Sequence, residues 1–370
     1  MFLDSYNTTS FSEPFFSLFK RELEKIGHDV FIFAPGTKEQ KEYNVDNNVF
    51  LFTSTSFKEY PDFKIPVFPF VSVSKIVKNL SLDIIHSFAI GTMGVAAANV
   101  AKKLNIPSIS TVDKIPHELT KAFFDANPFS NVIVDLASKY IRWLYHHFSV
   151  IVSPSNFASN KLSDIGINAN KIIPNGIDIA FFSKKEKERK LRNNSIFVGS
   201  LIKEKNLDAI IDVLPSLFNK NPNVKFTIYG NGPLVSSLNE KVYSLLLSDK
   251  VKLIIGTFSK SEIRKKYAKS FTFIYPPSIE PFPREPFEAL LQGCLPLHPK
   301  HSAIHEYLNI DELFYSSVKD LPQVVNNILD MSSRDISRIK HRSSTVIREK
   351  LDISIVAKEY IELYEVISKR

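Results

Sequence analysis

The sequence predicts an α/β protein made of two Rossmann-like domains that face each other across a cleft. Short β-branched and aromatic runs alternate with longer helical patterns, and this alternation restarts midway along the 370 residues. A chain of this length suits two domains of ~150–200 residues each. We expect an N-terminal domain over residues 1–183, completed by a C-terminal helix over 353–370, and a C-terminal domain over 184–352.

The N-terminal half contains four runs that predict buried strands, at 30–35, 82–88, 107–112 and 149–154. Helical patterns lie between them, as at 15–27 and 92–105. Strand and helix in strict alternation favour a parallel sheet with helices on both faces.

The C-terminal half begins after PNGID at 174–178, which predicts a turn, and a charged stretch at 184–194 that we expect to be solvated. Strands are then predicted at 195–200, 225–230, 252–256 and 271–277. Helices are predicted at 207–220 and 260–269, and the amphipathic segment 353–370 closes the chain. Ligands of open parallel sheets bind beyond the carboxyl ends of the strands, so the loops after 200, 230, 256 and 277 should form one row.

Composition and charge narrow the class of protein. Cys294 is the single cysteine, the N-terminus lacks the order of a signal peptide, and no apolar run approaches the ~18 residues of a spanning helix. We therefore expect a cytoplasmic protein, with a peripheral position on the inner face of the membrane as an alternative. The net charge of +8 suits an anionic membrane surface or an anionic small substrate, although a biased codon composition explains it equally well. No zinc spacing or nucleic-acid-binding motif is visible, so nucleic acid is not an expected partner.

The most informative stretch is SIEPFPREPFEALLQGCLP at 278–296, in which Glu280 and Glu288 stand eight residues apart. Pro286 suits the first turn of a helix and Gly293 suits its end. The N-terminus of that helix would suit a phosphate, Glu288 the paired hydroxyls of a ribose, and Glu280 the hydroxyls of a second group. This combination predicts a nucleotide-sugar site. A capped surface helix with two solvated glutamates is the alternative.

Six segments in chain order, GHDV, PSNF, PNGID, FVGSLIKEKN, GNGP and the E-x7-E pattern, resemble family 4 of the retaining glycosyltransferases, which have the GT-B fold. The resemblance covers nearly the whole chain. It implies a hexosyltransferase-type enzyme that moves a sugar from a UDP- or GDP-sugar to a hydroxyl of a membrane lipid or a glycan, with retention. It also implies that no metal or cofactor is needed, since the leaving phosphate accepts the acceptor's proton.

The resemblance also implies residue roles. Lys205 would contact the donor diphosphate, Glu280 the donor sugar and Glu288 the ribose. Arg284 lies inside the phosphate loop and could add positive charge there. Other candidates on the donor side are Ser200, Phe282, Pro283, Glu285, Thr257 and Phe258. Candidates on the acceptor side are Asp113, His117, His86, Ser12 and Glu13, with a satisfied buried histidine as the favoured alternative for His86.

Four departures from the family pattern leave other functions open. Ser200 replaces an arginine, Pro283 a glycine and Asp113 a histidine, and the first loop, YNTTSFSEPFF, lacks glycine. A catalytically decayed GT-B binding or partner protein is the first alternative, and a sugar-nucleotide epimerase or a basic nucleic-acid binder is a weaker one. The stretch 136–148 mixes aromatic and basic residues and could lie on a membrane, although a core helix is the favoured interpretation.

Overall fold

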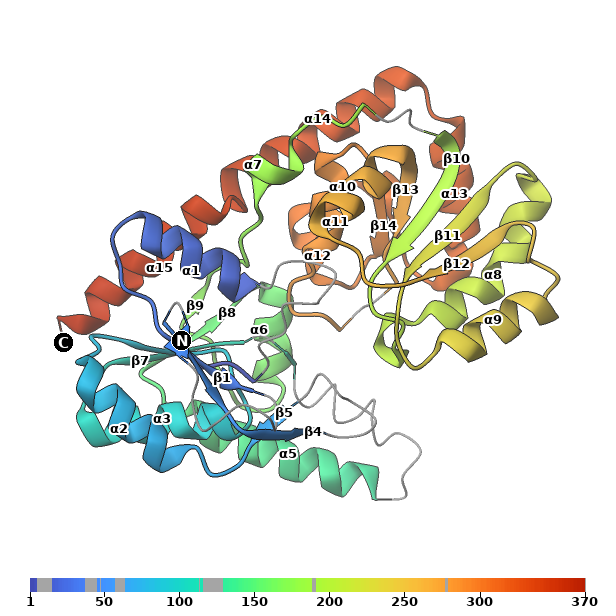
Figure 1. Cartoon of the computed structure of the whole chain (residues 1–370). Helices are drawn as coiled ribbons and strands as arrows, with labels where there is room; N and C mark the ends of the chain where they lie inside the picture. Colours follow the sequence, from blue (N-terminus) through green and yellow to red (C-terminus); the bar gives the residue numbers. More distant parts are fainter. Residues whose placement is uncertain are drawn as a thin grey trace. The chain divides into compact units, whose positions relative to one another are not determined.

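The computed structural model describes residues 1–4, 15–36, 45–46, 48–56, 64–112, 114–115, 129–187, 191–276 and 279–369. These residues form two compact units, each with its own sheet (Figure 1). The chain leaves the first unit after Pro174 and returns to it at Val356. The predicted α/β class with parallel sheets is confirmed.

The first unit contains six described helices and nine strands. The helices are α1 (Phe15–Lys25), α2 (Phe70–Leu80), α3 (Thr92–Leu104), α5 (Ser130–Tyr145), α6 (Asn156–Ser163) and α15 (Ile353–Ser368). The strands are β1 (Ile32–Pro35), β2 (Val45–Asp46), β3 (Val49–Phe52), β4 (Ser54–Ser56), β5 (Lys64–Pro66), β6 (Ile85–Ser87), β7 (Ser108–Thr111), β8 (Val150–Ser153) and β9 (Lys171–Ile172).

The sheet of the first unit is mainly parallel. Strands β6, β7, β8 and β9 pair in that order, and β1 pairs with β3. Phe2 forms single bridges to Phe33 and Ser87, so residue 2 joins β1 to β6. The expectation of strictly parallel pairing is wrong between residues 45 and 66, where β2 runs antiparallel to β3 and β4 runs antiparallel to β5.

Alternation along β6 assigns the helices of the first unit to the two faces of its sheet. Ile85 packs in a core with α2, α3 and Leu144 of α5. The next residue, His86, points to the opposite face, since side chains alternate along a strand. There it contacts Phe19 of α1 and Tyr364 of α15. The C-terminal helix therefore belongs to the core of the first unit.

The second unit contains one longer parallel sheet. Its strands are β10 (Leu191–Val198), β11 (Lys225–Gly230), β12 (Val251–Ile255), β13 (Ser270–Ile274), β14 (Leu295–Pro299) and β15 (Phe314–Tyr315). Its α-helices are α7 (Ile179–Phe182), α8 (Leu207–Lys220), α9 (Val235–Ser244), α10 (Lys260–Lys269), α11 (Glu285–Leu291), α12 (Ala303–Tyr307), α13 (Leu321–Asp330) and α14 (Ser333–Lys350). Three short 3₁₀ turns are η1 (Lys203–Lys205), η2 (Asp311–Leu313) and η3 (Val318–Asp320).

The strand order of this sheet is β12-β11-β10-β13-β14-β15, and every pair is parallel. Helices α8, α9 and α13 pack together on one face, and α10 and α11 pack together on the other (Figure 1). The order reverses between β10 and β13, because β10 leads outward to β11 whereas β13 leads outward to β14. Such a reversal is where open parallel sheets bind ligands.

One sequence prediction at the start of the second unit needs adjustment. Strand β10 begins at Leu191, so the stretch expected to be solvated over 184–194 contributes the first four residues of a strand. The PNGID segment packs closely against the junction between α14 and α15. Ile177 pairs with Asp352, and a Cβ atom on Gly176 would lie 2.5 Å from Ile353. Only glycine fits that approach.

Among the described residues, no helix combines the length and the hydropathy needed to cross a membrane.

Candidate active site

The candidate donor residues follow strands β10, β12 and β13 at the carboxyl edge of the second sheet. Ser200 and Lys205 follow β10, and the loop that contains Glu280 follows β13. These two strands are neighbours and enclose the reversal of strand order. The fold therefore brings together Lys205 and Glu280, which are 75 residues apart in sequence.

Close backbone packing holds the loop after β10. The Leu201 amide donates to the Asn231 carbonyl at 2.8 Å, and the Leu234 amide donates to the Leu201 carbonyl at 3.1 Å. A Cβ atom on Gly230 would lie 2.0 Å from the Gly199 carbonyl oxygen, and one on Gly232 would lie 2.4 Å from that of Leu201. The GNGP segment therefore acts as a packing turn that holds the loop in front of Lys205.

Lys205 is almost buried and forms an ion pair with Glu280. Its side chain is 10% exposed, and Nζ donates to Oε1 of Glu280. Burial opposes a charge on this lysine, but attraction to Glu280 and Glu285 outweighs burial, so the pKa of Lys205 is raised. The lysine is therefore a protonated cation at the position where the sequence predicted a diphosphate contact.

Tyr275 is a residue of this cluster that the sequence analysis missed. Its hydroxyl donates to Oε2 of Glu280, and Lys205 Nζ lies 5.4 Å from the centre of its ring. Burial raises the pKa of Tyr275 well above its ordinary value, so the phenol keeps its proton. The available signal was a tyrosine at the end of a buried strand, directly before a functional loop.

The loop after Glu280 contributes backbone rather than side chains at two predicted positions. Phe282 is 7% exposed and packs against Phe287 and Tyr307, with ring centres 5.3 and 5.4 Å apart. The Phe282 side chain therefore belongs to the core, so any contact of this residue with the donor would come from its backbone. Pro283 is also buried, and its missing N–H removes one potential contact to phosphate.

The helix after this loop begins and ends as predicted. Arg284 is the N-cap of α11, Pro286 lies in the first turn, and Gly293 follows the end with a φ of +71°. The Arg284 carbonyl accepts hydrogen bonds from the amides of Phe287 and Glu288, each 3.0 Å long. Arg284 and Glu285 are both half-buried at the start of the helix.

Glu288 is buried yet incompletely paired. It is 3% exposed, and its Oε2 atom has no hydrogen-bond partner among the described residues. Burial raises the pKa of Glu288 to about 7, and the nearby Arg284 guanidinium offsets only part of that rise. Buried polar atoms are nearly always hydrogen-bonded, so this oxygen is what a site for a hydroxyl-bearing ligand would contain.

A second ion pair lies near Glu288. Asp178 accepts from the Phe181 amide at 2.9 Å and from Lys260 Nζ at 2.7 Å. Lys260 and Asp178 both act electrostatically on Glu288, with opposite signs. The aspartate of the PNGID segment therefore caps α7 and anchors a lysine within range of the buried carboxylate.

Thr257 and Phe258 follow β12, as predicted. Thr257 is exposed, whereas Phe258 packs edge-to-face on Tyr229 with ring centres 5.6 Å apart. Lys266 Nζ lies 4.4 Å from the centre of the Phe258 ring and 4.5 Å from that of Tyr229. This aromatic pair forms one wall at the carboxyl edge of the sheet.

On the predicted acceptor side, His86 is a structural residue. Its Nδ1 bonds Tyr364 Oη at 2.6 Å and its Nε2 bonds Thr111 Oγ1 at 2.7 Å, and it is 3% exposed. Burial lowers its pKa well below the ordinary value. These contacts support the favoured interpretation of His86 as a satisfied buried histidine. The remaining acceptor-side candidates, Asp113, His117, Ser12 and Glu13, lie outside the described residues.

The segment 136–148 has two distinct faces. Ile141, Leu144 and Tyr145 are buried, as a core helix requires. Leu136 is 60% exposed and Trp143 is 47% exposed on the other face of α5. The segment is thus a core helix that also presents an apolar, aromatic surface.

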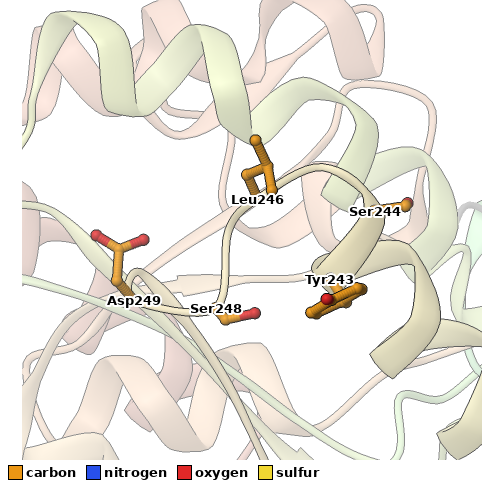
Figure 2. Close-up of a pocket in the computed structure, with 5 residues that line it drawn as sticks. All are labelled: Tyr243, Ser244, Leu246, Ser248 and Asp249. Carbon is orange, nitrogen blue, oxygen red and sulfur yellow. The ribbon is translucent and has the colours of Figure 1, made fainter.

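A surface pocket elsewhere in the second unit is separate from this cluster. It has a volume of about 430 Å³ and is lined by Tyr243, Ser244, Leu246, Ser248 and Asp249. Figure 2 shows these side chains arising from the end of α9 and the turn that follows. That turn leads into the start of β12, so the pocket lies at the amino ends of the strands, opposite the donor candidates. No group of three or more metal-ligating side chains occurs in the described part of the chain.

Comparison with known families accounts for both units. Residues 16–181 match the model "Glycosyltransferase Family 4", and residues 178–336 match "Glycosyl transferases group 1". Together the two models span most of the chain. The chain is a glycosyltransferase with a family 4 domain over residues 16–181. Its candidate donor residues all lie in the region matched by the second model.

Curated relatives of this glycosyltransferase are distant. The alpha-monoglucosyldiacylglycerol synthase of Streptococcus pneumoniae is 26% identical over 273 residues, which cover 69% of this chain and 60% of that protein. The chain thus spans less than two thirds of that relative's length. The GDP-mannose-dependent alpha-mannosyltransferase of Corynebacterium glutamicum is 22% identical, over 84% of this chain and 75% of that protein.

Solved structures confirm the predicted GT-B fold. Anabaena HepE in complex with UDP matches with a TM-score of 0.73 and 17% identity, over 99% of both chains. A sucrose-phosphate synthase from Thermosynechococcus elongatus matches with a TM-score of 0.69 and 13% identity, over 94% of this chain and 91% of that chain.

Proposed function

We propose that this glycosyltransferase moves a hexose from a nucleoside-diphosphate sugar to an acceptor hydroxyl, with retention of configuration. The observation that carries the proposal is the pair of glutamates around the loop after β13. Glu280 is held by Lys205 and Tyr275, while Glu288 is buried with an oxygen that lacks a partner among the described residues. The first would hold the donor sugar and the second the ribose.

Lys205 and Arg284 would stabilise the leaving diphosphate. Charge builds on that group as the bond between the anomeric carbon and the phosphate oxygen breaks. The acceptor oxygen then bonds to the anomeric carbon on the same face, and its proton passes to the leaving phosphate oxygen. Preorganised cations at such a position commonly contribute 10²–10³ in rate, about 3–4 kcal/mol. We propose that these side chains supply this charge without a metal ion.

UDP-sugars are the donors we propose first. HepE structures contain UDP or UDP-glucose, and the Corynebacterium relative is named for GDP-mannose, so GDP-sugars are the second choice. A membrane lipid is the acceptor we propose first, because two relatives, from Streptococcus pneumoniae and Acholeplasma laidlawii, are named alpha-monoglucosyldiacylglycerol synthases. A glycan is the second choice.

An anionic membrane surface would suit a lipid acceptor. The net charge is +8, and Leu136 and Trp143 are exposed on α5. Apolar and aromatic side chains with nearby cations are typical of helices that bind membrane surfaces. Co-sedimentation with phosphatidylglycerol vesicles but not with phosphatidylcholine vesicles would support this part. No binding to either would favour the glycan acceptor.

The donor site is tested first, since that test needs no acceptor. Thermal shifts are measured with UDP, GDP, ADP and their sugars, on wild type, Glu288→Gln and the exposed control Glu240→Gln. A ligand at ~100 times its dissociation constant adds ~2.7 kcal/mol of stability. Stabilisation by one base in wild type and the control, reduced in Glu288→Gln, would support the proposal. No shift with any nucleotide at millimolar concentration would overturn it.

The reaction products distinguish a transferase from an epimerase and from a partner protein. Sugar transfer to a lipid or glycan extract identifies a transferase. Conversion of the donor to its epimer without an acceptor would identify an epimerase. Binding without turnover would identify a partner protein.

A further inference from the structure

The carboxylate of Glu280 accepts hydrogen bonds from two different side chains, one on each oxygen. Lys205 Nζ donates to Oε1, and the Tyr275 hydroxyl donates to Oε2. The Glu280 side chain is 29% exposed, so the carboxylate lies at the boundary between the core and solvent. A carboxylate held at both oxygens has a defined direction.

Lys205 and Tyr275 should respond differently when a nucleotide-sugar binds. A diphosphate attracts Lys205, which is flexible beyond its Cβ atom and carries a full charge. Oε1 of Glu280 would then lose all or part of its partner, and that oxygen would face the sugar hydroxyls. With Lys205 as its only partner, Glu280 would lose its orientation at the moment when it must bind the sugar.

Tyr275 has no comparable freedom. It is 1% exposed, its amide donates to the Leu297 carbonyl at 2.8 Å, and its carbonyl accepts from the Tyr315 hydroxyl at 3.2 Å. The backbone is thus held from both sides, and the buried ring has little room to turn. Because burial raises the pKa of Tyr275, its hydroxyl stays protonated and remains a donor at neutral pH.

We propose that Tyr275 is a positioning residue for donor-sugar recognition, whose hydroxyl keeps the Glu280 carboxylate directed at the sugar when Lys205 engages the diphosphate. This inference rests on the proposed function. It assigns Oε2 of Glu280 to Tyr275 and leaves Oε1 to accept hydrogen bonds from the sugar. Tyr275 itself touches neither the nucleotide nor the sugar.

The test compares Tyr275→Phe with Tyr360→Phe. Both variants delete one buried hydroxyl, but the Tyr360 hydroxyl pairs with Thr111 in the first unit and not with Glu280. Dissociation constants are measured by calorimetry for UDP and UDP-glucose, and for GDP and GDP-mannose. The readout is the ratio of the dissociation constant of the nucleotide to that of the matching nucleotide-sugar. This ratio isolates the contribution of the sugar to binding from that of the diphosphate.

Tyr275→Phe should bind the nucleotide within twofold of wild type but lose about tenfold or more in affinity for the nucleotide-sugar, as expected for a bond to a charged group. Tyr360→Phe should change both affinities by less than twofold. In a Glu280→Gln background, Tyr275→Phe should add less than threefold, because the group it positions is already altered.

Three outcomes would overturn the inference in distinguishable ways. An unchanged ratio in Tyr275→Phe would remove Tyr275 from sugar recognition and leave the proposed function intact. Equal losses of affinity for the nucleotide and for the nucleotide-sugar, together with a lower melting temperature, would make Tyr275 a purely structural residue. Wild type that binds neither pair of ligands would overturn the proposed function, and this inference with it.

Discussion

The two units each bury a titratable side chain, His86 on β6 and Glu288 on α11, yet these two side chains are satisfied differently. In the first unit, both ring nitrogens of His86 are bonded, to Thr111 and Tyr364. In the second unit, Glu288 is equally buried, but one of its oxygens has no partner in the described part of the structure. Buried groups that find partners inside the protein stabilise its fold, whereas one without a partner is available to a ligand.

The pKa shifts of these two groups have opposite consequences. Burial lowers the pKa of His86 from its ordinary 6.5, so the unfolded chain binds that proton more tightly and stability falls as pH drops below 6.5. Burial raises the pKa of Glu288 from 4.5 to about 7, so the folded protein binds that proton more tightly and stability falls as pH rises from 4.5 to 7. The stability of a variant at each position should therefore differ from that of wild type in its own pH range, which is below 6.5 for His86 and between 4.5 and 7 for Glu288.

The largest effect on stability should come from His86→Ala. It removes a ring that stacks on Phe88 at 4.2 Å between centres, and it leaves Thr111 and Tyr364 without this partner. We expect a loss of about 3–5 kcal/mol in the free energy of unfolding, measured by denaturant titration. Nucleotide affinity should stay within twofold.

The control for this prediction is His146→Ala, since His146 is exposed and should change stability by less than about 0.5 kcal/mol. If His86→Ala kept wild-type stability but lost acceptor binding, His86 would belong to the acceptor site after all.

The next largest effect should come from Lys205→Ala, and it should fall on catalysis. Removing the cation beside the proposed diphosphate position should reduce donor turnover by roughly 10²–10³. Lys241→Ala is the matched control, because Lys241 forms an exposed ion pair with Asp212 at 2.8 Å on the surface of the same unit. Turnover within threefold of wild type in Lys205→Ala would exclude the lysine from charge stabilisation.

Glu288→Gln should change how the stability of the protein depends on pH. The wild-type carboxylate should cost about 3 kcal/mol of stability between pH 4.5 and 7, from its shifted pKa, and the amide should not. The difference in melting temperature between wild type and variant should therefore shift in favour of the variant as pH rises through this window. A difference independent of pH would mean that Glu288 does not titrate there.

Much of the fold followed from the sequence because local patterns determine it. Alternating apolar strands and amphipathic helices predicted the parallel strands of both sheets, and the predicted helix at 260–269 matches α10. The short strands between residues 45 and 66 were missed, because two to four residues give no readable period. The start of β10 was missed because its first residues are polar and exposed.

The candidate site was predictable only where a motif spans it. The proline-rich loop predicted both glutamates and the helix after them, and a resemblance supplied Lys205. Tyr275 was missed because its contact with Glu280, five residues further on, depends on how the loop between them folds. The Lys260–Asp178 pair could not be predicted, because it joins residues 82 positions apart in the chain. The sequence left two interpretations of His86 open, because a strand-end histidine looks the same in sequence whether its partners are ligands or side chains of the protein.

The smallest effect should come from Arg284→Ala, which tests whether a second cation serves the donor. Arg284 is half-buried at the start of α11 and acts electrostatically on Glu288. A partly solvated cation contributes less than a buried one, so we expect roughly a three- to tenfold loss of UDP affinity, about 1 kcal/mol. Because salt screens exposed charges, the loss of affinity should shrink between about 0.05 and about 0.5 M salt.

The exposed Arg338 of α14, which pairs with Asp335 at 3.2 Å, provides the control for a general change in net charge. Unchanged affinity and turnover in Arg284→Ala would leave Lys205 as the cation that compensates for the serine at position 200.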